Sequence, residues 1–435
     1  MTENHSEGLV TCVEEDRISN LPKHLIESIL EGLPVPDVVK TSILSKKWRY
    51  RWTKMRALVF DKQFFRKYAK YGAFGGNGFT RIINKVLILH KGPISKFLLH
   101  IPPKYEFDDS FEEVDQWMML LSRNGVRELI LTDSNQRYEL PSYVFSCLEL
   151  TKLKLRNCFF KPPLKIEGFL NLNDLELWNI DFRANLCGTQ INLPQLKKLS
   201  MSWCTNVYNF NINATKLQAL IVIRCPDAML LRLLQSPYLT LICVSFQKPI
   251  EDNVQVEKTT LPIMLSNLRK IVVLYLDGFF FKALIAEKIP KWLPHPVNSL
   301  KRLFFVDVKL DDLDQLHGAL CLLRNSPKLE SLSVMSFNMN PQAIYYDVEP
   351  ASNHLESPNC LDCRLHRLQT VKIECLEGSK PELLFIKLLL AHSPSLQKFT
   401  ITTSRALNAK KIIDICKDVM RFPRASRKAE VIYSS

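Results

Sequence analysis

A recurring leucine pattern constrains the fold of this 435-residue chain more than any other feature. The pattern has apolar residues at its first, fourth and sixth positions, and often Cys or Asn at its ninth. Because alternate side chains of a strand point to opposite faces, the fourth and sixth residues share one buried face. Each copy is therefore expected to form a strand that packs against the neighbouring copies. The clear copies are Leu150, Leu153, Leu155, Cys158; Leu172, Leu175, Leu177, Ile180; Leu196, Leu199, Met201, Cys204; and Leu217, Leu220, Val222, Cys225.

Later copies are looser and are separated by longer segments. Helical periodicity is present in two of these segments, DDLDQLHGALCLLRNSP and PELLFIKLLLAHSP, and each ends at a Ser-Pro turn. The pattern therefore predicts an α/β fold, a curved leucine-rich-repeat solenoid with strands on the concave face and helices and irregular turns on the convex face. The looser copies are Leu268, Ile271, Val273; Leu300, Leu303, Phe305; Leu329, Leu332, Val334; Leu368, Val371, Ile373; and Leu396, Phe399, Ile401.

The segment from Asp16 to Arg56 carries more apolar side chain than it can bury by itself. One short helix should follow Pro22, a second should start at Pro36, and a third, capped by Ser45, should carry Trp48 and Trp52. A unit of about 40 residues is near the lower limit for a self-sufficient core. The surplus predicts either a docking surface for a partner protein or a face that packs on the following domain, and periodicity alone leaves both open.

A resemblance to the plant F-box is carried by the string DRISNLPKHLIESILEGLPVPDVVKTSILSKKWRYRW. In that family three helices dock on a Skp-type adaptor protein, which ties the receptor to a cullin. The pair Val35-Pro36 departs from the family, which often has a polar residue or two there, and should alter only the helix start. The resemblance implies an adaptor-binding surface made of Leu21, Pro22, Leu25, Ile29, Leu30, Leu33, Val38, Leu44 and Trp48.

The carboxyl-terminal sequence resembles the FBD region of plant F-box/FBD/leucine-rich-repeat proteins. The likeness is carried by LHRLQTVKIECLEGSKPELLFIKLLLAHSPSLQKFTI and VMRFPRASRKAEVIY, and earlier runs such as ISKFLLHIP agree with it. We expect a flexible amino terminus over 1–15, an F-box over 16–60, leucine-rich repeats over 80–365, and an FBD region with the last repeats over 366–435. The resemblance implies a non-catalytic substrate-recognition subunit of an SCF-type ubiquitin ligase (Skp adaptor, cullin, F-box protein), with a protein substrate whose identity is unknown.

Residues beside the template leucines should face the concave surface, which solenoids commonly use for binding. We expect basic residues on the early strands and an unusually apolar middle, which also includes Leu274 and Val306. Either a substrate occupies this band, or a loop over Gln247 to Thr260 covers it. The candidate substrate-binding residues are Lys154, Arg156, Trp178, Ile221, Ile223, Val272 and Phe304.

No residue set argues for an enzyme, a cofactor or a resident metal. Cys360, Cys363 and His366 form a zinc-like group, but they lack a matching second pair of ligands. The template cysteines Cys158 and Cys204 should turn inward as small apolar residues, and the chain's cysteines are expected to be free thiols.

The net charge of +14 is spread along the chain, so nucleic acid is not the expected partner. The alternative is a basic repeat solenoid that binds nucleic acid or an anionic ligand and has no ubiquitin role. The acidic amino terminus does not resemble a signal peptide, and no apolar run is long enough to span a bilayer. We therefore expect no membrane segment and a location in the nucleus, the cytoplasm or both.

Overall fold

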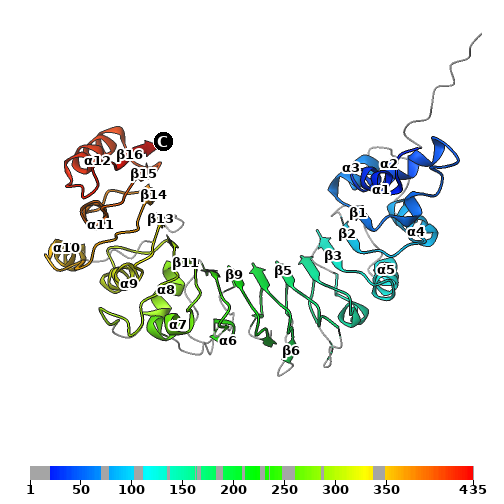
Figure 1. Cartoon of the computed structure of the whole chain (residues 1–435), viewed down its shortest axis with the longest axis horizontal. Helices are drawn as coiled ribbons and strands as arrows, with labels where there is room; N and C mark the ends of the chain where they lie inside the picture. The colour runs from blue at the N-terminus through cyan, green and yellow to red at the C-terminus, as the bar shows by residue number, and fades with distance from the viewer. Residues whose placement is uncertain are drawn as a thin grey trace, which may run out of the picture. The chain divides into compact units, whose positions relative to one another are not determined.

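The computed structural model describes residues 20–69, 78–101, 111–134, 138–161, 163, 168–182, 190–207, 211–225, 231–234, 236–246, 260–285, 289–336 and 348–434. The chain divides into two compact units, Met1–Ser134 and Asn135–Ser435. Each unit contains parallel strands that are ordered along the sequence (Figure 1).

The first unit begins with short helices at the predicted places. Helix α1 covers Lys23–Glu31, and α2 covers Val35–Lys40 with a proline in its first turn. Pro22 precedes α1 and Gly32 follows it, as the proline-first, glycine-last preference of helices predicts. A 3₁₀ turn, Thr41–Ile43, extends α2.

The expected third α-helix over Trp48 and Trp52 is not formed. Residues 45–51 make hydrogen-bonded turns, and only Trp52–Lys54 forms a 3₁₀ helix. The backbone bonds here join residues three apart, as from Trp48 N to Ser45 O at 3.1 Å. Repulsion among the neighbouring lysines and arginines, together with the low helix propensity of Trp and Tyr, accounts for the failure of the α-helix.

Three parallel strands complete the first unit. Strand β1 (Ala57–Phe60) pairs with β2 (Lys96–Ile101), and β2 pairs with β3 (Glu128–Asp133). Helices α3 (Lys62–Ala69), α4 (Gly78–Leu89) and α5 (Glu112–Arg123) connect or flank them. Strand β1 lies inside the segment 16–60 that the sequence assigns to the F-box.

The second unit is a ladder of parallel strands whose buried residues follow the leucine template. Leu153 pairs with Leu175, Leu175 with Leu199, and Leu199 with Leu220, and all four side chains are buried. The strands are β4 (Lys152–Arg156), β5 (Asp174–Trp178), β7 (Lys198–Ser202), β9 (Ala219–Ile223), β10 (Leu241–Ser245), β11 (Val273–Asp277), β12 (Arg302–Val306), β13 (Ser331–Met335), β14 (Thr370–Leu376), β15 (Lys398–Thr403) and β16 (Glu430–Ser434).

The structure corrects the template at two neighbouring strands. Strand β10 is an additional repeat that the sequence analysis missed, although Leu239, Ile242 and Val244 fit the template and are buried. On β11 the predicted alignment through Val273 is wrong, because Leu274 pairs with Leu303 of β12. The buried residues of this repeat are Ile271, Leu274 and Leu276.

Helices and irregular segments cover the outer side of the second unit, as predicted (Figure 1). Helix α9 (Leu313–Arg324) begins at Asp312, whose carboxylate accepts from the backbone N–H groups of Asp314 and Gln315. Helix α11 (Lys380–His392) begins with a capping box formed by Ser379 and Glu382. Both helices stop before a Ser-Pro pair. The other elements are the 3₁₀ helix Ser142–Ser146, β6 (Gln190–Asn192), β8 (Asn211–Asn213), α6 (Leu231–Leu234), α7 (Leu261–Asn267), α8 (Gly278–Leu284), α10 (Val348–Glu356) and α12 (Ala409–Arg421).

Among the described residues, none of the helices has both the length and the apolar character needed to cross a bilayer.

Candidate protein-binding surfaces

The first unit exposes a set of large apolar side chains, which we call the amino-terminal apolar surface. Leu25 and Ile29 lie one turn apart on α1 and are 43% and 45% exposed. Leu33 is 39% exposed, Ile43 86% and Leu44 67%. Exposed apolar side chains that gather in one segment mark a site of protein interaction more often than single exposed ones do.

The proposed adaptor-binding residues do not all reach this surface. Leu30, Val38 and Trp48 are buried, with 1%, 0% and 3% of their surface exposed, so the expectation that they contact a partner directly is wrong. They face inward because α1 and α2 need them for their own small core. Pro22 is exposed and Leu21 is half-buried. Ile43, which the sequence reading omitted, is the most exposed large apolar residue described in this segment.

The concave face of the second unit begins with charged strands. Lys154 Nζ on β4 lies 2.5 Å from Glu176 Oε2 on β5, and Lys198 Nζ on β7 lies 3.9 Å from Asp174 Oδ1. These four side chains are partly exposed, so each pair adds at most about 1 kcal/mol to stability. The pairs interrupt any continuous positive stripe on this face.

The middle strands carry an apolar strip of half-buried residues. Ile221, Cys243, Tyr275 and Phe304 follow one another across β9, β10, β11 and β12 in register. The rings of Tyr275 and Phe304 are stacked, with centroids 6.0 Å apart. The concave apolar strip comprises Ile221, Ile223, Leu241, Cys243, Val273, Tyr275 and Phe304.

Three residues predicted for this strip lie elsewhere. Val272 precedes β11 and is outside the strand row. Leu274 and Val306 are in the core, at 0% and 2% exposure, because the true register of β11 puts Leu274 inward and the last residue of β12 is covered. The concave positions of β11 are Val273 and Tyr275. Residues 247–259, the greater part of the proposed covering loop, lie outside the described residues.

Burial changes the acidity of two groups on the strip. Burial raises the pKa of the Tyr275 hydroxyl to about 12, and Cys243, Asp277 and Asp307 add to the increase. The pKa of Cys243 also rises to about 12, through burial and the charge of Asp277. Both groups are therefore neutral at physiological pH, and Tyr275 can act as a hydrogen-bond donor.

Two arginine–tryptophan pairs lie where β4, β5, β7 and β9 end. The guanidinium carbon of Arg156 is 3.8 Å from the ring centroid of Trp178. The guanidinium carbon of Arg224 is likewise 3.8 Å from the ring centroid of Trp203. Arg156 and Trp178 were predicted from the sequence. Trp203 and Arg224 were not, although each directly precedes an inward cysteine of the template, Cys204 or Cys225.

Comparison with known sequences supports the two-part architecture. Residues 18–59 match the F-box domain, and residues 86–429 match the family described as At1g61320/AtMIF1, LRR domain. The chain is 32% identical to F-box/FBD/LRR-repeat protein At1g13570 of Arabidopsis thaliana, over 96% of this chain and 98% of the relative. The chain belongs to the F-box/FBD/LRR-repeat family.

Two other Arabidopsis thaliana relatives are more distant in sequence. F-box/FBD/LRR-repeat protein At3g26920 is 24% identical over 96% of each chain. Probable FBD-associated F-box protein At1g32375 is 22% identical over 96% of this chain and all of the relative. The similarity thus extends over both units, and the LRR family match runs to residue 429, through most of the segment that the sequence assigns to an FBD region.

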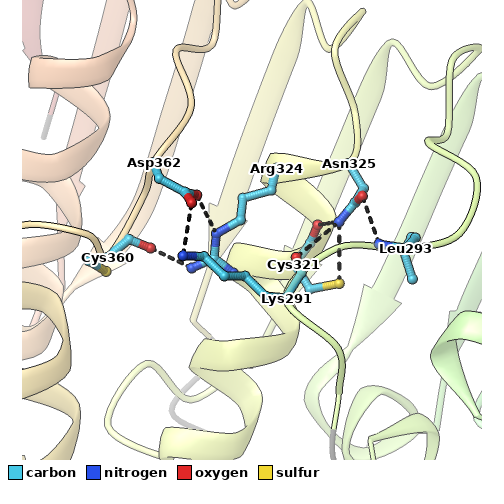
Figure 2. Close-up of polar contacts among 7 residues, drawn as sticks. All are labelled: Lys291, Leu293, Cys321, Arg324, Asn325, Cys360 and Asp362. Carbon is cyan, nitrogen blue, oxygen red and sulfur yellow. Dashed lines mark hydrogen bonds and ion pairs between the residues drawn. The ribbon is translucent and has the colours of Figure 1, made fainter.

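In this F-box/FBD/LRR-repeat protein, the residues of the zinc-like group do not come together as metal ligands. The carbonyl of Cys360 accepts a hydrogen bond from Arg324, and the Cys360 thiol points away from the surrounding polar network (Figure 2). Cys360 is buried and His366 is exposed. Within the described residues, no group of three or more His, Cys, Asp or Glu side chains could hold a metal ion.

The polar network instead ties two connecting segments to the end of α9 (Figure 2). One segment contains Lys291 and Leu293, and the other contains Cys360 and Asp362. Asp362 is 2.8 Å from Lys291 Nζ and 3.5 Å from Arg324 Nε, and its bond to Lys291 is the main cause of its lowered pKa. Buried Asn325 accepts from the Leu293 N–H at 3.0 Å and donates to the Cys321 carbonyl at 2.8 Å. These bonds give the network a structural role.

The inward cysteines also have a structural role. Cys158, Cys204 and Cys225 are buried as predicted, and the ten described cysteines are free thiols. The Cys225 thiol lies 3.4 Å from the Ile223 carbonyl and accepts from the Cys204 N–H at 3.3 Å. Because each cysteine follows a strand, it can form hydrogen bonds with the backbone of the neighbouring turn.

Proposed function

We propose that this chain is a substrate-recognition subunit of an SCF-type ubiquitin ligase, acting in the nucleus, the cytoplasm or both. The observation that carries the proposal is the amino-terminal apolar surface, which lies within the matched F-box. F-box domains generally bind Skp1-type adaptors, and an apolar partner would remove Ile29, Ile43 and Leu44 from water. Full burial of a wholly exposed side chain of this size favours association by about 1.5–3 kcal/mol, so these partly exposed residues contribute less than that each.

The repeats would then hold the target protein. The concave apolar strip and its charged margin have the apolar centre and polar rim of a protein interface. The chain needs no catalytic group for this role, because binding alone raises the effective concentration of the target near the ubiquitin-charged enzyme of the complex. Family membership supports a non-catalytic adaptor.

Co-purification of the full chain with a Skp-type adaptor tests the proposal. Leu25→Asp combined with Ile29→Asp should abolish capture, because two charges would enter an apolar contact. These positions are exposed, so the variant should still fold; buried Leu30 is avoided for this reason. Leu148→Asp, at a 60% exposed leucine of the second unit, is the matched control and should bind as the unmodified chain does.

The same preparation distinguishes the alternative function. If adaptor capture is unaffected by the double substitution, or absent in the unmodified chain, while binding to nucleic acid falls steeply with salt, the chain is a basic nucleic-acid-binding solenoid instead.

A further inference from the structure

The last strand of the ladder has one free edge. Among the described residues, β16 pairs with β15 and has no strand on its other side (Figure 1). The Glu430 N–H donates to the Gln397 carbonyl beside β15 at 2.9 Å. Because alternate residues of a strand direct their N–H and C=O groups to opposite sides, those of Val431 and Tyr433 point to the free edge. Such an edge is a template for another strand.

The inward side of β16 is incompletely covered. Val431 and Tyr433 pair with Phe399 and Ile401 of β15, so they face the core. Phe399 and Ile401 are buried at 0% exposure, whereas Val431 and Tyr433 are only half-buried. Each repeat of a solenoid is covered by its neighbours, and in the part of the chain that the structure describes no further repeat follows β16. The core is therefore open at this end.

Helix α12 leaves an apolar flank exposed. Ile415 is buried and lies against Gly378, which belongs to the preceding repeat. Residues two apart differ by about 200° around a helix, so Ile413 points nearly the opposite way, away from the preceding repeat. Ile413 is 52% exposed, and Met420, about two turns further along the same side, is 66% exposed. In α11, which contacts α10 and α12, only lysines are exposed.

The exposed flank of α12 and the free edge of β16 lie at one level of the solenoid. Burial raises the pKa of Tyr433 to about 12, and the nearby thiol of Cys416, in the middle of α12, adds to the increase. Helix α12 connects two parallel strands, so it runs antiparallel to them. We call the free edge of β16 together with Ile413 and Met420 the terminal surface.

The strand part of the terminal surface is complementary to itself. A two-fold axis through Ile432 would pair β16 with the β16 of a second copy in antiparallel orientation. Val431 would lie opposite Tyr433 of the second copy, and their N–H and C=O groups would meet as a hydrogen-bonded pair. Glu430 would lie opposite Ser434, so no like charges would meet along the strands. The two Ile432 side chains would be in contact at the axis.

The same axis brings the helix flanks together. The two-fold axis of an antiparallel strand pair is perpendicular to the sheet, so it would also pass between the two α12 helices near Cys416. Ile413 and Met420 lie three residues before and four residues after Cys416, so Ile413 of one copy would meet Met420 of the other. Lys417 beside this flank is 3.7 Å from Asp414, and this pairing reduces repulsion across the axis.

We propose that the chain forms a two-fold symmetric dimer through the terminal surface. Closed two-fold dimers are the commonest symmetric assemblies, and their contacts require a surface that matches itself. The proposal does not depend on the proposed function. If that function holds as well, a dimer offers two recognition faces, so a target with two copies of the recognised segment binds more tightly.

Light scattering coupled to gel filtration of the full chain tests the proposal. At micromolar concentration the unmodified chain should have twice the 50.3 kDa mass of one chain. Ile432→Lys should raise the dissociation constant of the dimer at least about tenfold, because two positive charges would face each other at the axis. Ile432 is in register with half-buried Thr400, outside the core, so the variant should fold. Thr400→Lys, one strand away, is the matched control and should dimerise normally.

A charge exchange tests the position of the axis. Ile432→Glu should also separate the copies, whereas an equimolar mixture of the Ile432→Lys and Ile432→Glu chains should restore the dimer, because opposite charges then face each other. Ile413→Asp combined with Met420→Asp tests the helix flank. Both positions are exposed, so this variant should fold and be monomeric.

Several results would overturn the proposal. A monomeric unmodified chain would mean that another molecule covers the terminal surface or that the surface stays open. A dimer that survives Ile432→Lys would place the contact elsewhere, and a mixture that stays monomeric would exclude an axis at Ile432. Oligomers larger than two chains would indicate open-ended edge pairing. Adaptor capture is a separate measurement, so none of these results bears on the F-box proposal.

Discussion

Single residues decide which face of each strand is buried. On β4 the alternation of Leu153 and Leu155 with basic residues sets the register unambiguously. On β11 the run from Ile271 to Leu276 is almost continuously apolar, so period-two alternation carries no information there. The strand pairing selects Leu274, and with it Tyr275 becomes a concave residue.

A matched pair of substitutions tests this register. Leu274→Ala should lower the free energy of unfolding by about 2–5 kcal/mol, because it removes a fully buried side chain and leaves a cavity. Val272→Ala, at a half-buried position outside the strand, should cost less than about 1 kcal/mol. Urea unfolding of the full chain measures both. Equal losses, or a larger loss at Val272, would mean that the β11 register is wrong.

At the scale of strands and helices, the elements that could be predicted are those with a clear local sequence signal. Strands β4, β5, β7 and β9 and helices α9 and α11 follow from leucine spacing, helical periodicity and the Ser-Pro stops. Strand β10 could have been predicted, because Leu239, Ile242 and Val244 fit the template 22 positions after Leu217, Leu220 and Val222; it lacks only the Cys or Asn at the ninth position, which is Gln247. The segment 45–51 was predicted as a helix from its tryptophan spacing, but its clustered positive charges prevail over that pattern.

Helices α9 and α10 meet at a histidine pair that should make stability depend on pH. The rings of His317 and His354 are 4.5 Å apart. Burial is the largest cause of the lowered pKa of both; Arg324 lowers each further, Lys291 acts on His354, and Asp314 opposes the shift at His317. As pH falls below about 6.5, the unfolded chain binds protons more readily than the folded one, so the free energy of unfolding should decrease.

Denaturation at pH 7.5 and about pH 5.5, values chosen to bracket the ordinary histidine pKa, checks this expectation. His317→Asn with His354→Gln should flatten the loss relative to the unmodified chain, whereas exposed His366→Gln should not. Burial raises the pKa of Glu382, which titrates with the opposite sign but is common to all the variants. The same pH dependence in the double variant would contradict the assignment.

At the scale of the whole molecule, each unit has one surface that its own core does not explain. The excess of apolar residues in the first unit could be foreseen from composition, but which of them are exposed could not, since α1 buries Leu30 and exposes Leu25 and Ile29. In the second unit, Arg156 and Trp178 could be foreseen from the strand template. Their counterparts Trp203 and Arg224 required knowledge of the left-handed turns.

The central claim is that the amino-terminal apolar surface is an adaptor-binding site, and titration calorimetry of the full chain with a Skp-type adaptor tests it most directly. The account predicts saturable binding with a negative heat-capacity change, the mark of apolar burial, and little dependence on salt. Ile43→Asp with Leu44→Asp should abolish the heat, whereas Leu148→Asp should preserve it. Absence of binding by the unmodified chain, or full binding by the Ile43 and Leu44 variant, would contradict the claim.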